Sequence, residues 1–232
     1  VAGIYGLSFA LAMMNVALAM VVLRRPRRQL AWLGLLLALC LLPALPDQVE
    51  GRQTARLLQP NIHPDELKSG HWTAERQARH LRRMAFLSTE GAAALDPARP
   101  DLVIWPEYPV PAYYSRDPSF RNYMKNLSAR LGAPLIFNSI QVLPGAQPRP
   151  LNSAMTLDAR GTLVSQYDKI FLVPFGEFVP WPFSLFIDKV TMVAGDFVPG
   201  ERVVVTSLDE HRIGTFICYE SVFARGVREF AR

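Results

Sequence analysis

Residues 213–220 of this 232-residue chain read Ile-Gly-Thr-Phe-Ile-Cys-Tyr-Glu. The first five have the apolar, β-rich composition of a buried strand, which carries Cys218 to a strand end just before a helix predicted to start at Ser221. In α/β folds this position suits a catalytic nucleophile, because a strand end is rigid and a helix N-terminus stabilises negative charge. The position predicts a lowered pKa for the Cys218 thiol. The alternative is that Cys218 is an inert thiol in the core.

Segments typical of strands alternate with helical segments from Asp47 onward. The predicted strands cover residues 55–59, 102–105, 134–142, 153–157, 163–167, 203–207 and 212–217, and the predicted helices cover 71–89, 119–131 and 221–232. Residues 171–182 are rich in Pro, Gly and aromatic side chains, which indicates an ordered loop. This alternation predicts an α/β sandwich with mixed sheets.

Two apolar runs precede this domain, at residues 1–23 and 30–45, and a basic turn from Arg24 to Arg28 separates them. Because about 20 apolar residues span the hydrocarbon core, residues 1–46 are predicted to form two transmembrane helices with the basic turn in the cytoplasm. Everything after Asp47 then lies outside the cytoplasm. A secretory signal from Arg24 to Pro46 is the alternative, and the apolar run before it argues against this. The start at Val1, directly in a span, predicts a fragment of a longer membrane protein.

The charge distribution argues against nucleic-acid binding. The cysteines and histidines show no pattern of a disulfide scaffold or a metal site. The net charge is +5, but four arginines lie in the basic turn, so residues 47–232 carry 21 basic and 20 acidic groups. A nucleic-acid-binding protein would spread a basic patch over its folded domain, so no nucleic-acid partner is expected. Cys40 and Cys218 are too few for a disulfide scaffold, and the histidines show no metal-binding spacing. Cys40 is expected to pack passively in a helix.

Three segments, each at a predicted strand or strand end, carry a resemblance to a known family. They are Ile104-Trp105-Pro106-Glu107, the long segment from Tyr167 to Pro180, and Ile217-Cys218-Tyr219-Glu220. Together they resemble the Glu-Lys-Cys triad segments of the nitrilase superfamily. With two membrane spans before the domain, the chain resembles the apolipoprotein N-acyltransferase family, whose first strand is also similar to residues 57–62. The resemblance implies a nitrilase-like α-β-β-α sandwich over residues 47–232, incomplete at its C-terminus.

The resemblance implies a role for each matching residue. Cys218 matches the nucleophile, Glu107 the general base, and Lys169 the cation beside the oxyanion. The chemistry is coherent, because a thiol that attacks an ester needs a proton acceptor and a positive charge near the developing oxyanion. Glu177 matches a second glutamate that supports the lysine and the substrate amine. Supporting or substrate-binding roles are implied for three further residues: Tyr219, Glu220 and, on a weaker match, Trp72.

Each of these residues has an ordinary alternative when taken alone. Glu107 and Glu177 could be solvated carboxylates, and Lys169 could form a surface pair with Asp168 worth under about 1 kcal/mol. Their occurrence together, in family order and in matching local sequence, favours catalysis. Two interpretations stay open for the aromatic residues of the loop region, which could form a loop core or an apolar wall for acyl chains: Phe171, Phe175, Phe178, Trp181, Phe183 and Phe186.

The function implied by the resemblance is acyl transfer at the bacterial inner membrane, with the catalytic domain on the extracytoplasmic side. Cys218 would take a fatty acyl group from a phospholipid as a thioester. The N-terminal amine of a diacylglyceryl-cysteine apolipoprotein would then accept it, without a cofactor or metal. Two other functions stay open: a membrane-tethered amidase that uses the same triad, and a catalytically inactive binding domain anchored by the helices.

Overall fold

The computed structural model describes residues 3–26, 53–63, 72–89, 99–144, 149–181 and 197–231, together with the isolated residues 34 and 51. The chain divides into two compact units, residues 1–51 and residues 52–232. We describe each unit by itself.

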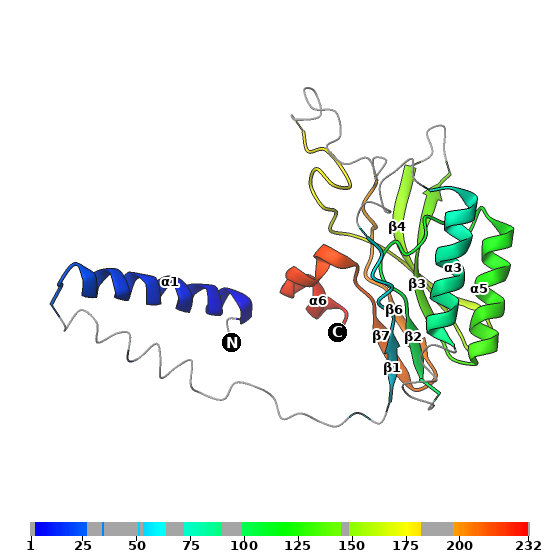
Figure 1. Cartoon of the computed structure of the whole chain (residues 1–232), viewed down its shortest axis with the longest axis horizontal. Helices are drawn as coiled ribbons and strands as arrows, with labels where there is room; N and C mark the ends of the chain where they lie inside the picture. Colours follow the sequence, from blue (N-terminus) through cyan, green and yellow to red (C-terminus); the bar gives the residue numbers. More distant parts are fainter. Residues whose placement is uncertain are drawn as a thin grey trace. The chain divides into compact units, whose positions relative to one another are not determined.

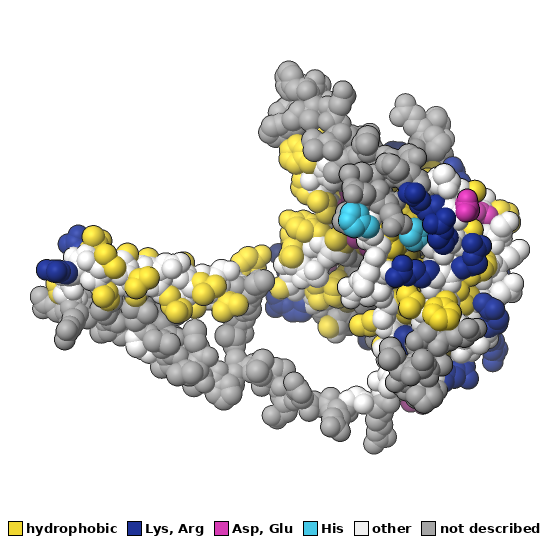
Figure 2. Space-filling view, viewed as in Figure 1, with side chains coloured by type: hydrophobic (Ala, Val, Ile, Leu, Met, Phe, Trp, Pro, Cys, Tyr) yellow, Lys and Arg dark blue, Asp and Glu magenta, His cyan; other side chains and the backbone are white. Residues whose placement is uncertain are grey.

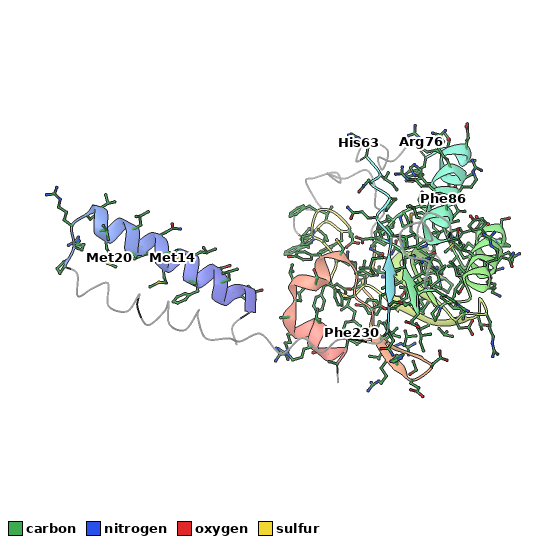
Figure 3. All side chains as sticks on the ribbon, turned by 60° about the horizontal axis from the view of Figure 1, so that its bottom comes forward. Met14, Met20, His63, Arg76, Phe86 and Phe230 are labelled. Atoms are coloured by element: carbon green, nitrogen blue, oxygen red, sulfur yellow. The ribbon has the colours of Figure 1, made fainter. Side chains whose placement is uncertain are left out.

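The N-terminal unit contains helix α1, Gly3–Val22, whose hydrophobic side chains are largely exposed. Many of them lie on the face of the helix seen in Figure 2, and Met14, labelled in Figure 3, is one of them. Among the described residues, α1 is the one helix long and apolar enough to cross a membrane, with a mean hydropathy of 1.9 over residues 5–22. Apart from residue 34, the second predicted span lies outside the described residues, as do Cys40 and the last two arginines of the basic turn.

The C-terminal unit is built on a mixed five-stranded sheet, as the strand and helix alternation predicts. The order in the sheet is β1-β2-β3-β4-β5, and a separate two-stranded sheet pairs β6 with β7 (Figure 1). The strands are β1 (Ala55–Leu57), β2 (Leu102–Ile104), β3 (Leu135–Leu143), β4 (Arg149–Leu157), β5 (Leu163–Asp168), β6 (Val205–Leu208) and β7 (His211–Gly214). The first three strands are parallel, while β4 and β5 continue the sheet as antiparallel hairpins.

Two helices, α3 (Ala74–Ser88) and α5 (Pro118–Leu131), cover one face of the five-stranded sheet (Figure 1). The Asp117 side chain caps α5 by accepting hydrogen bonds from two backbone N–H groups of its first turn. Gly132 ends it in the left-handed conformation that favours glycine, with φ at 59°. The core between helices and sheet contains fully buried side chains from both layers, among them Met84, Met124, Leu127, Leu135, Phe137 and Leu157.

The strand β4 shows how the two faces of the sheet are used. Met155 and Leu157 belong to the core under the helices, whereas Ala154 packs in a second cluster with Tyr167 and Ile217. Because successive strand residues point to opposite faces, the C-terminal segment lies against the face away from the helices. This layering agrees with the predicted sandwich and brings the segment before Cys218 onto β4 and β5.

The region around Cys218 differs from its predicted secondary structure. The strand expected over residues 212–217 ends at Gly214, because the β6–β7 pairing extends only that far. In place of a helix from Ser221, the chain forms a 3₁₀ helix, η4 (Cys218–Val222), followed by the short helix α6 (Ala224–Glu229). The backbone N–H of Glu220 donates to the carbonyl of Ile217, three residues earlier, and this tighter turn sets the geometry of the Cys218 segment.

Candidate active site

Glu107 is held by the segment that leaves β2. The preceding Trp105 is buried, its indole N–H donates to Ser88 Oγ at 2.9 Å, and its backbone N–H donates to the carbonyl of Ile136 at 2.9 Å. These bonds anchor the strand end to α3 and β3. The Glu107 side chain is about one quarter exposed, with 26% of its surface accessible. It therefore reaches from a fixed backbone into a site that solvent can enter.

Lys169 directly follows β5 and is almost fully buried, with 1% of its side chain exposed. Its ammonium lies 3.0 Å from the Glu177 carboxylate and 3.5 Å from Glu107 Oε1. Burial lowers the pKa of Lys169, but the charges of Glu107 and Glu177 and the hydrogen bond to Glu177 outweigh it, so the pKa is raised. Lys169 is thus a fixed cation within the fold and not half of a surface pair with Asp168.

Asn152 ties the two glutamates together. Its side-chain N–H₂ donates to Glu107 Oε1 and to Glu177 Oε1, both at 2.8 Å, and the residue is fully buried. Its own oxygen accepts a hydrogen bond from Asn138 Nδ2 at 2.7 Å. Asn138 Oδ1 in turn accepts from the backbone N–H of Tyr108 at 3.2 Å. The two asparagines therefore fix the orientation of both carboxylates from inside the sheet.

Sequence analysis missed both asparagines, although a signal was present. Asn138 lies in the β3 segment Leu-Ile-Phe-Asn-Ser-Ile, and Asn152 lies in the β4 segment Pro-Leu-Asn-Ser-Ala-Met. An amide inside such an apolar strand must find hydrogen-bond partners when buried. Polar residues at these two positions could therefore have been identified as candidates for the site.

Glu177 belongs to the ordered loop predicted after Lys169. Its Oε2 accepts a hydrogen bond from the backbone N–H of Val173 at 2.9 Å, and its own N–H donates to the carbonyl of Val173. Three aromatic residues of this loop, Phe171, Phe175 and Trp181, are exposed by 40%, 38% and 81%. Their exposure favours an apolar wall over a loop core, whereas Phe178 is half-buried. Phe183 and Phe186 lie outside the described residues.

Cys218 is exposed and has a φ of 50°, a left-handed conformation that is strained for a non-glycine residue. Its thiol lies in the electrostatic field of both Glu107 and Lys169. Partial burial and the nearby carboxylate of Glu107 raise the pKa of Cys218, and Lys169 only partly offsets them. The expected lowered pKa is therefore wrong for the free site. The sulfur is a thiol positioned against a carboxylate.

The residues after Cys218 have different environments. Glu220 is buried and accepts four hydrogen bonds, from Tyr167 Oη and from the backbone N–H groups of Ile170, Phe171 and Ile217, at 2.7 to 3.1 Å. It joins the segment after Lys169 to the segment before Cys218. Tyr219 is 39% exposed and packs edge-on against Phe223.

Trp72 packs against the ring of His80 on α3, with 5.3 Å between ring centroids. No contact of Trp72 with the predicted catalytic residues is found in the described part of the chain. Phe230, labelled in Figure 3, packs on Tyr167 with 5.4 Å between ring centroids. It therefore supports the residue that binds Glu220.

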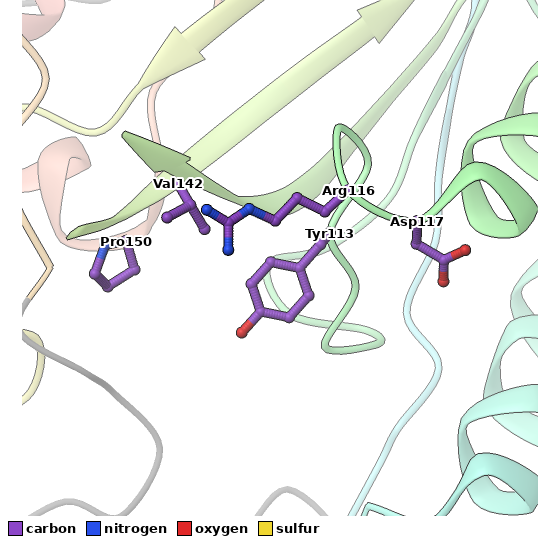
Figure 4. Close-up of a pocket in the computed structure, with 5 residues that line it drawn as sticks. All are labelled: Tyr113, Arg116, Asp117, Val142 and Pro150. Carbon is purple, nitrogen blue, oxygen red and sulfur yellow. The ribbon is translucent and has the colours of Figure 1, made fainter. Parts of the chain in front are cut away.

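An open pocket lies at one end of the paired strands β3 and β4. It has a volume of about 460 Å³ and is lined by Tyr113, Arg116, Asp117, Val142 and Pro150. The Arg116 side chain extends toward Val142, whereas Asp117 points away from it (Figure 4). Glu107, Lys169 and Cys218 are not part of its lining.

The structure brings together Glu107, Lys169, Cys218 and Glu177, which sequence analysis selected from three separate segments. A thiol beside a carboxylate, with a buried ammonium next to both, can attack a carbonyl, pass its proton to the carboxylate and stabilise the oxyanion. Among the described residues, no group of three or more His, Cys, Asp or Glu side chains could hold a metal ion.

The chain is similar to curated bacterial enzymes along most of its length. The apolipoprotein N-acyltransferase of Geobacter metallireducens is 30% identical over 247 residues, which cover 100% of this chain and 46% of the relative. The protein of the same name from Brucella suis is 32% identical over 189 residues, which cover 78% of this chain and 34% of the relative. The chain therefore spans less than half the length of these curated relatives.

Two solved structures show the same fold. The carbon-nitrogen hydrolase of Helicobacter pylori G27 has a TM-score of 0.51 at 17% identity and matches 76% of this chain and 55% of its own. Saccharomyces cerevisiae Nit3, of the nitrilase superfamily, has a TM-score of 0.52 at 19% identity and matches 67% of this chain and 55% of its own. The carbon-nitrogen hydrolase family matches residues 54–232, which contain every strand described above. The chain belongs to the carbon-nitrogen hydrolase family.

Proposed function

We propose that this chain is part of an N-acyltransferase that moves a fatty acyl group from a phospholipid to the N-terminal amine of a diacylglyceryl-cysteine apolipoprotein. The observation that carries the proposal is the pairing of Glu107 with the buried ammonium of Lys169 at 3.5 Å, with the Cys218 thiol in the electrostatic field of both. The names of the curated relatives supply the acceptor class. Since the chain spans less than half of those relatives, the activity is proposed for the whole protein.

In the first half-reaction, Cys218 Sγ attacks the ester carbonyl of the phospholipid while Glu107 takes the thiol proton. Lys169 stabilises the tetrahedral oxyanion. The carbon–oxygen bond then breaks, and the leaving alkoxide of the lysophospholipid takes the proton from Glu107. The product is a thioester on Cys218. A raised thiol pKa is compatible with this step, because proton transfer to Glu107 accompanies attack and no stored thiolate is required.

In the second half-reaction, the acceptor amine attacks the thioester carbon and Lys169 again faces the oxyanion. The carbon–sulfur bond breaks and the sulfur regains a proton. Glu107 relays protons in this step as well, and Glu177 and Asn152 hold Lys169 and Glu107 in place. Among these groups, Glu107, Lys169, Glu177 and Asn152 lie within hydrogen-bond or ion-pair distance of one another.

The exposed aromatic surface near the site fits a lipid donor. Phe171, Phe175 and Trp181 of the loop and Phe216 and Tyr219 beside Cys218 are all more than one third exposed. An apolar surface of this kind marks a contact with lipid, protein or ligand. We assign it to the acyl chains, with α1 in the bacterial inner membrane and the catalytic domain on the extracytoplasmic side.

A mass measurement tests the proposal directly. The full-length protein in detergent is incubated with phospholipid alone and its intact mass is recorded, with Cys218→Ala as the matched control. The expected result is a gain of one acyl group in the wild type and none in the variant. A wild-type protein that releases free fatty acid without ever gaining mass would instead support a hydrolase. A protein that binds phospholipid with neither outcome would support an inactive binding domain.

A further inference from the structure

Tyr108, the residue after Glu107, has a strained backbone. Its φ is 46°, in the left-handed region that non-glycine residues seldom adopt. The hydrogen bond from its N–H to Asn138 Oδ1 holds it there. Strain of this kind persists only where the surroundings impose it, and it is concentrated at functional sites. The direction of the Tyr108 side chain is therefore imposed by the same network that orients the glutamates.

The phenolic hydroxyl of Tyr108 is the second unusual feature of this residue. Its hydroxyl is buried and has no hydrogen-bond partner among the described residues. The ring packs at a tilt near Phe197, with centroids 6.4 Å apart. Burial raises the pKa of Tyr108, and the charges of Glu107 and Glu177 raise it further, so both carboxylates act on this phenol. A buried hydroxyl without a partner costs free energy, which a ligand can recover by binding it.

The charge of the site indicates which ligand this is. Two carboxylates, Glu107 and Glu177, face one ammonium, Lys169, so the cluster has one excess negative charge. Neither a Cys218 thiol nor a thioester changes that sum. The ester carbonyl of a phospholipid is uncharged, whereas a primary amine arrives at neutral pH as an ammonium. The negative site therefore favours the acceptor of the second half-reaction over the donor of the first.

We propose that the phenolic oxygen of Tyr108 accepts an N–H of the acceptor's amino group and so positions it against the thioester on Cys218. This inference rests on the proposed function and makes Tyr108 a residue that determines the amine acceptor. The ammonium gives one proton through Glu107 to solvent and its nitrogen forms the bond to carbon. The carbon–sulfur bond breaks, and a second proton from the nitrogen goes to the Cys218 sulfur.

The test separates the two half-reactions in the full-length protein. Acylation by phospholipid alone is followed by intact mass, and the consumption of preformed acyl-enzyme is followed as a function of the concentration of a synthetic diacylglyceryl-cysteine peptide. Tyr108→Phe is expected to acylate at the wild-type rate within about twofold. The peptide concentration for half-maximal turnover should rise about tenfold or more, since one hydrogen bond to a charged group is lost.

Tyr114→Phe is the matched control. Tyr114 also has a buried hydroxyl without a partner among the described residues, but the charge that acts on it is that of Arg121, not of a glutamate. The Tyr114→Phe variant should leave the rates of both half-reactions unchanged. A normal acylation rate in Tyr108→Phe shows that this variant is folded.

Two results would overturn the inference while leaving the proposed function intact. They are an unchanged peptide dependence in Tyr108→Phe and an equal loss in both half-reactions. A wild-type protein that never gains an acyl group would overturn the proposed function and this inference together.

Discussion

Replacing Glu220 by alanine should destabilise the catalytic domain more than any single exposed substitution. Its carboxylate accepts hydrogen bonds from Tyr167 Oη and Ile217 N, which are buried, and from Ile170 N and Phe171 N, which are partly buried. A buried donor left without a partner costs about 1–3 kcal/mol, and water can reach the partly buried pair at lower cost. The expected loss in the free energy of unfolding is therefore roughly 3–5 kcal/mol.

Glu220→Gln should fall between alanine and wild type. Oε1 accepts three of the four bonds and Oε2 accepts only that of Ile217 N. A glutamine can keep its oxygen at the position of Oε1, so only the backbone N–H of Ile217 then faces the side-chain N–H₂ group. This mismatch predicts a loss of about 1–3 kcal/mol.

Thermal unfolding of the full-length protein in detergent measures both losses. A loss of 3–5 kcal/mol corresponds to a fall in Tm of roughly 6–20 °C for a domain of this size. Glu210→Ala, at an exposed position in the β6–β7 turn, is the control and should leave the Tm unchanged within about 2 °C. The reasoning is refuted if Glu220→Ala unfolds at the temperature of this control, or if glutamine is as damaging as alanine.

The remaining predictions concern the reaction, the ionisation of the thiol and the membrane topology. Lys169→Ala should reduce the acylation rate by about 10²–10³-fold in single-turnover measurements. Lys169→Arg should restore little of this rate, because a planar guanidinium does not fit a site built around a compact ammonium. A fully active arginine variant would contradict the role of Lys169. In a Cys40→Ala background, alkylation of Cys218 by iodoacetamide should still be rising above pH 9, since the pKa of the thiol is raised. Glu107→Gln removes the negative charge that raises this pKa and should shift the profile to lower pH, whereas a shift to higher pH would refute the assignment. An impermeant thiol reagent applied outside the inner membrane should label Cys218, and labelling only after lysis would overturn the proposed topology.

Much of this arrangement could be predicted from local sequence. Apolar runs predicted β3 and β5 to within one residue at each end, whereas β4 was predicted only from Ser153 and begins four residues earlier, at Arg149. The segments around Glu107, Lys169 and Cys218 indicated which side chains would meet. The strand bounds and the three segments depend on local sequence pattern. The structure brings the side chains of these segments close to one another.

Other features depend on pairing between distant segments. Asn152 reaches both glutamates only because β3 and β4 pair in one particular register. The end of β7 at Gly214 follows from the length of its hairpin with β6. The pKa of Cys218 depends on the balance between Glu107 and Lys169 across the folded site. Local sequence contains none of these distances, so the polar network and the thiol pKa could not be derived from it.

The amide of Asn152 has a mechanical consequence for the loop that carries Glu177. That loop cannot swing away from the sheet without first breaking the bonds of Glu177 to Asn152 and Lys169. The same movement would leave Glu107 as the one carboxylate of the pair still bonded to Asn152 and to Lys169. Opening the loop and disassembling the charge arrangement are therefore a single event. The group that links the two carboxylates is an uncharged amide, so this link does not require any ionisation of Asn152 itself.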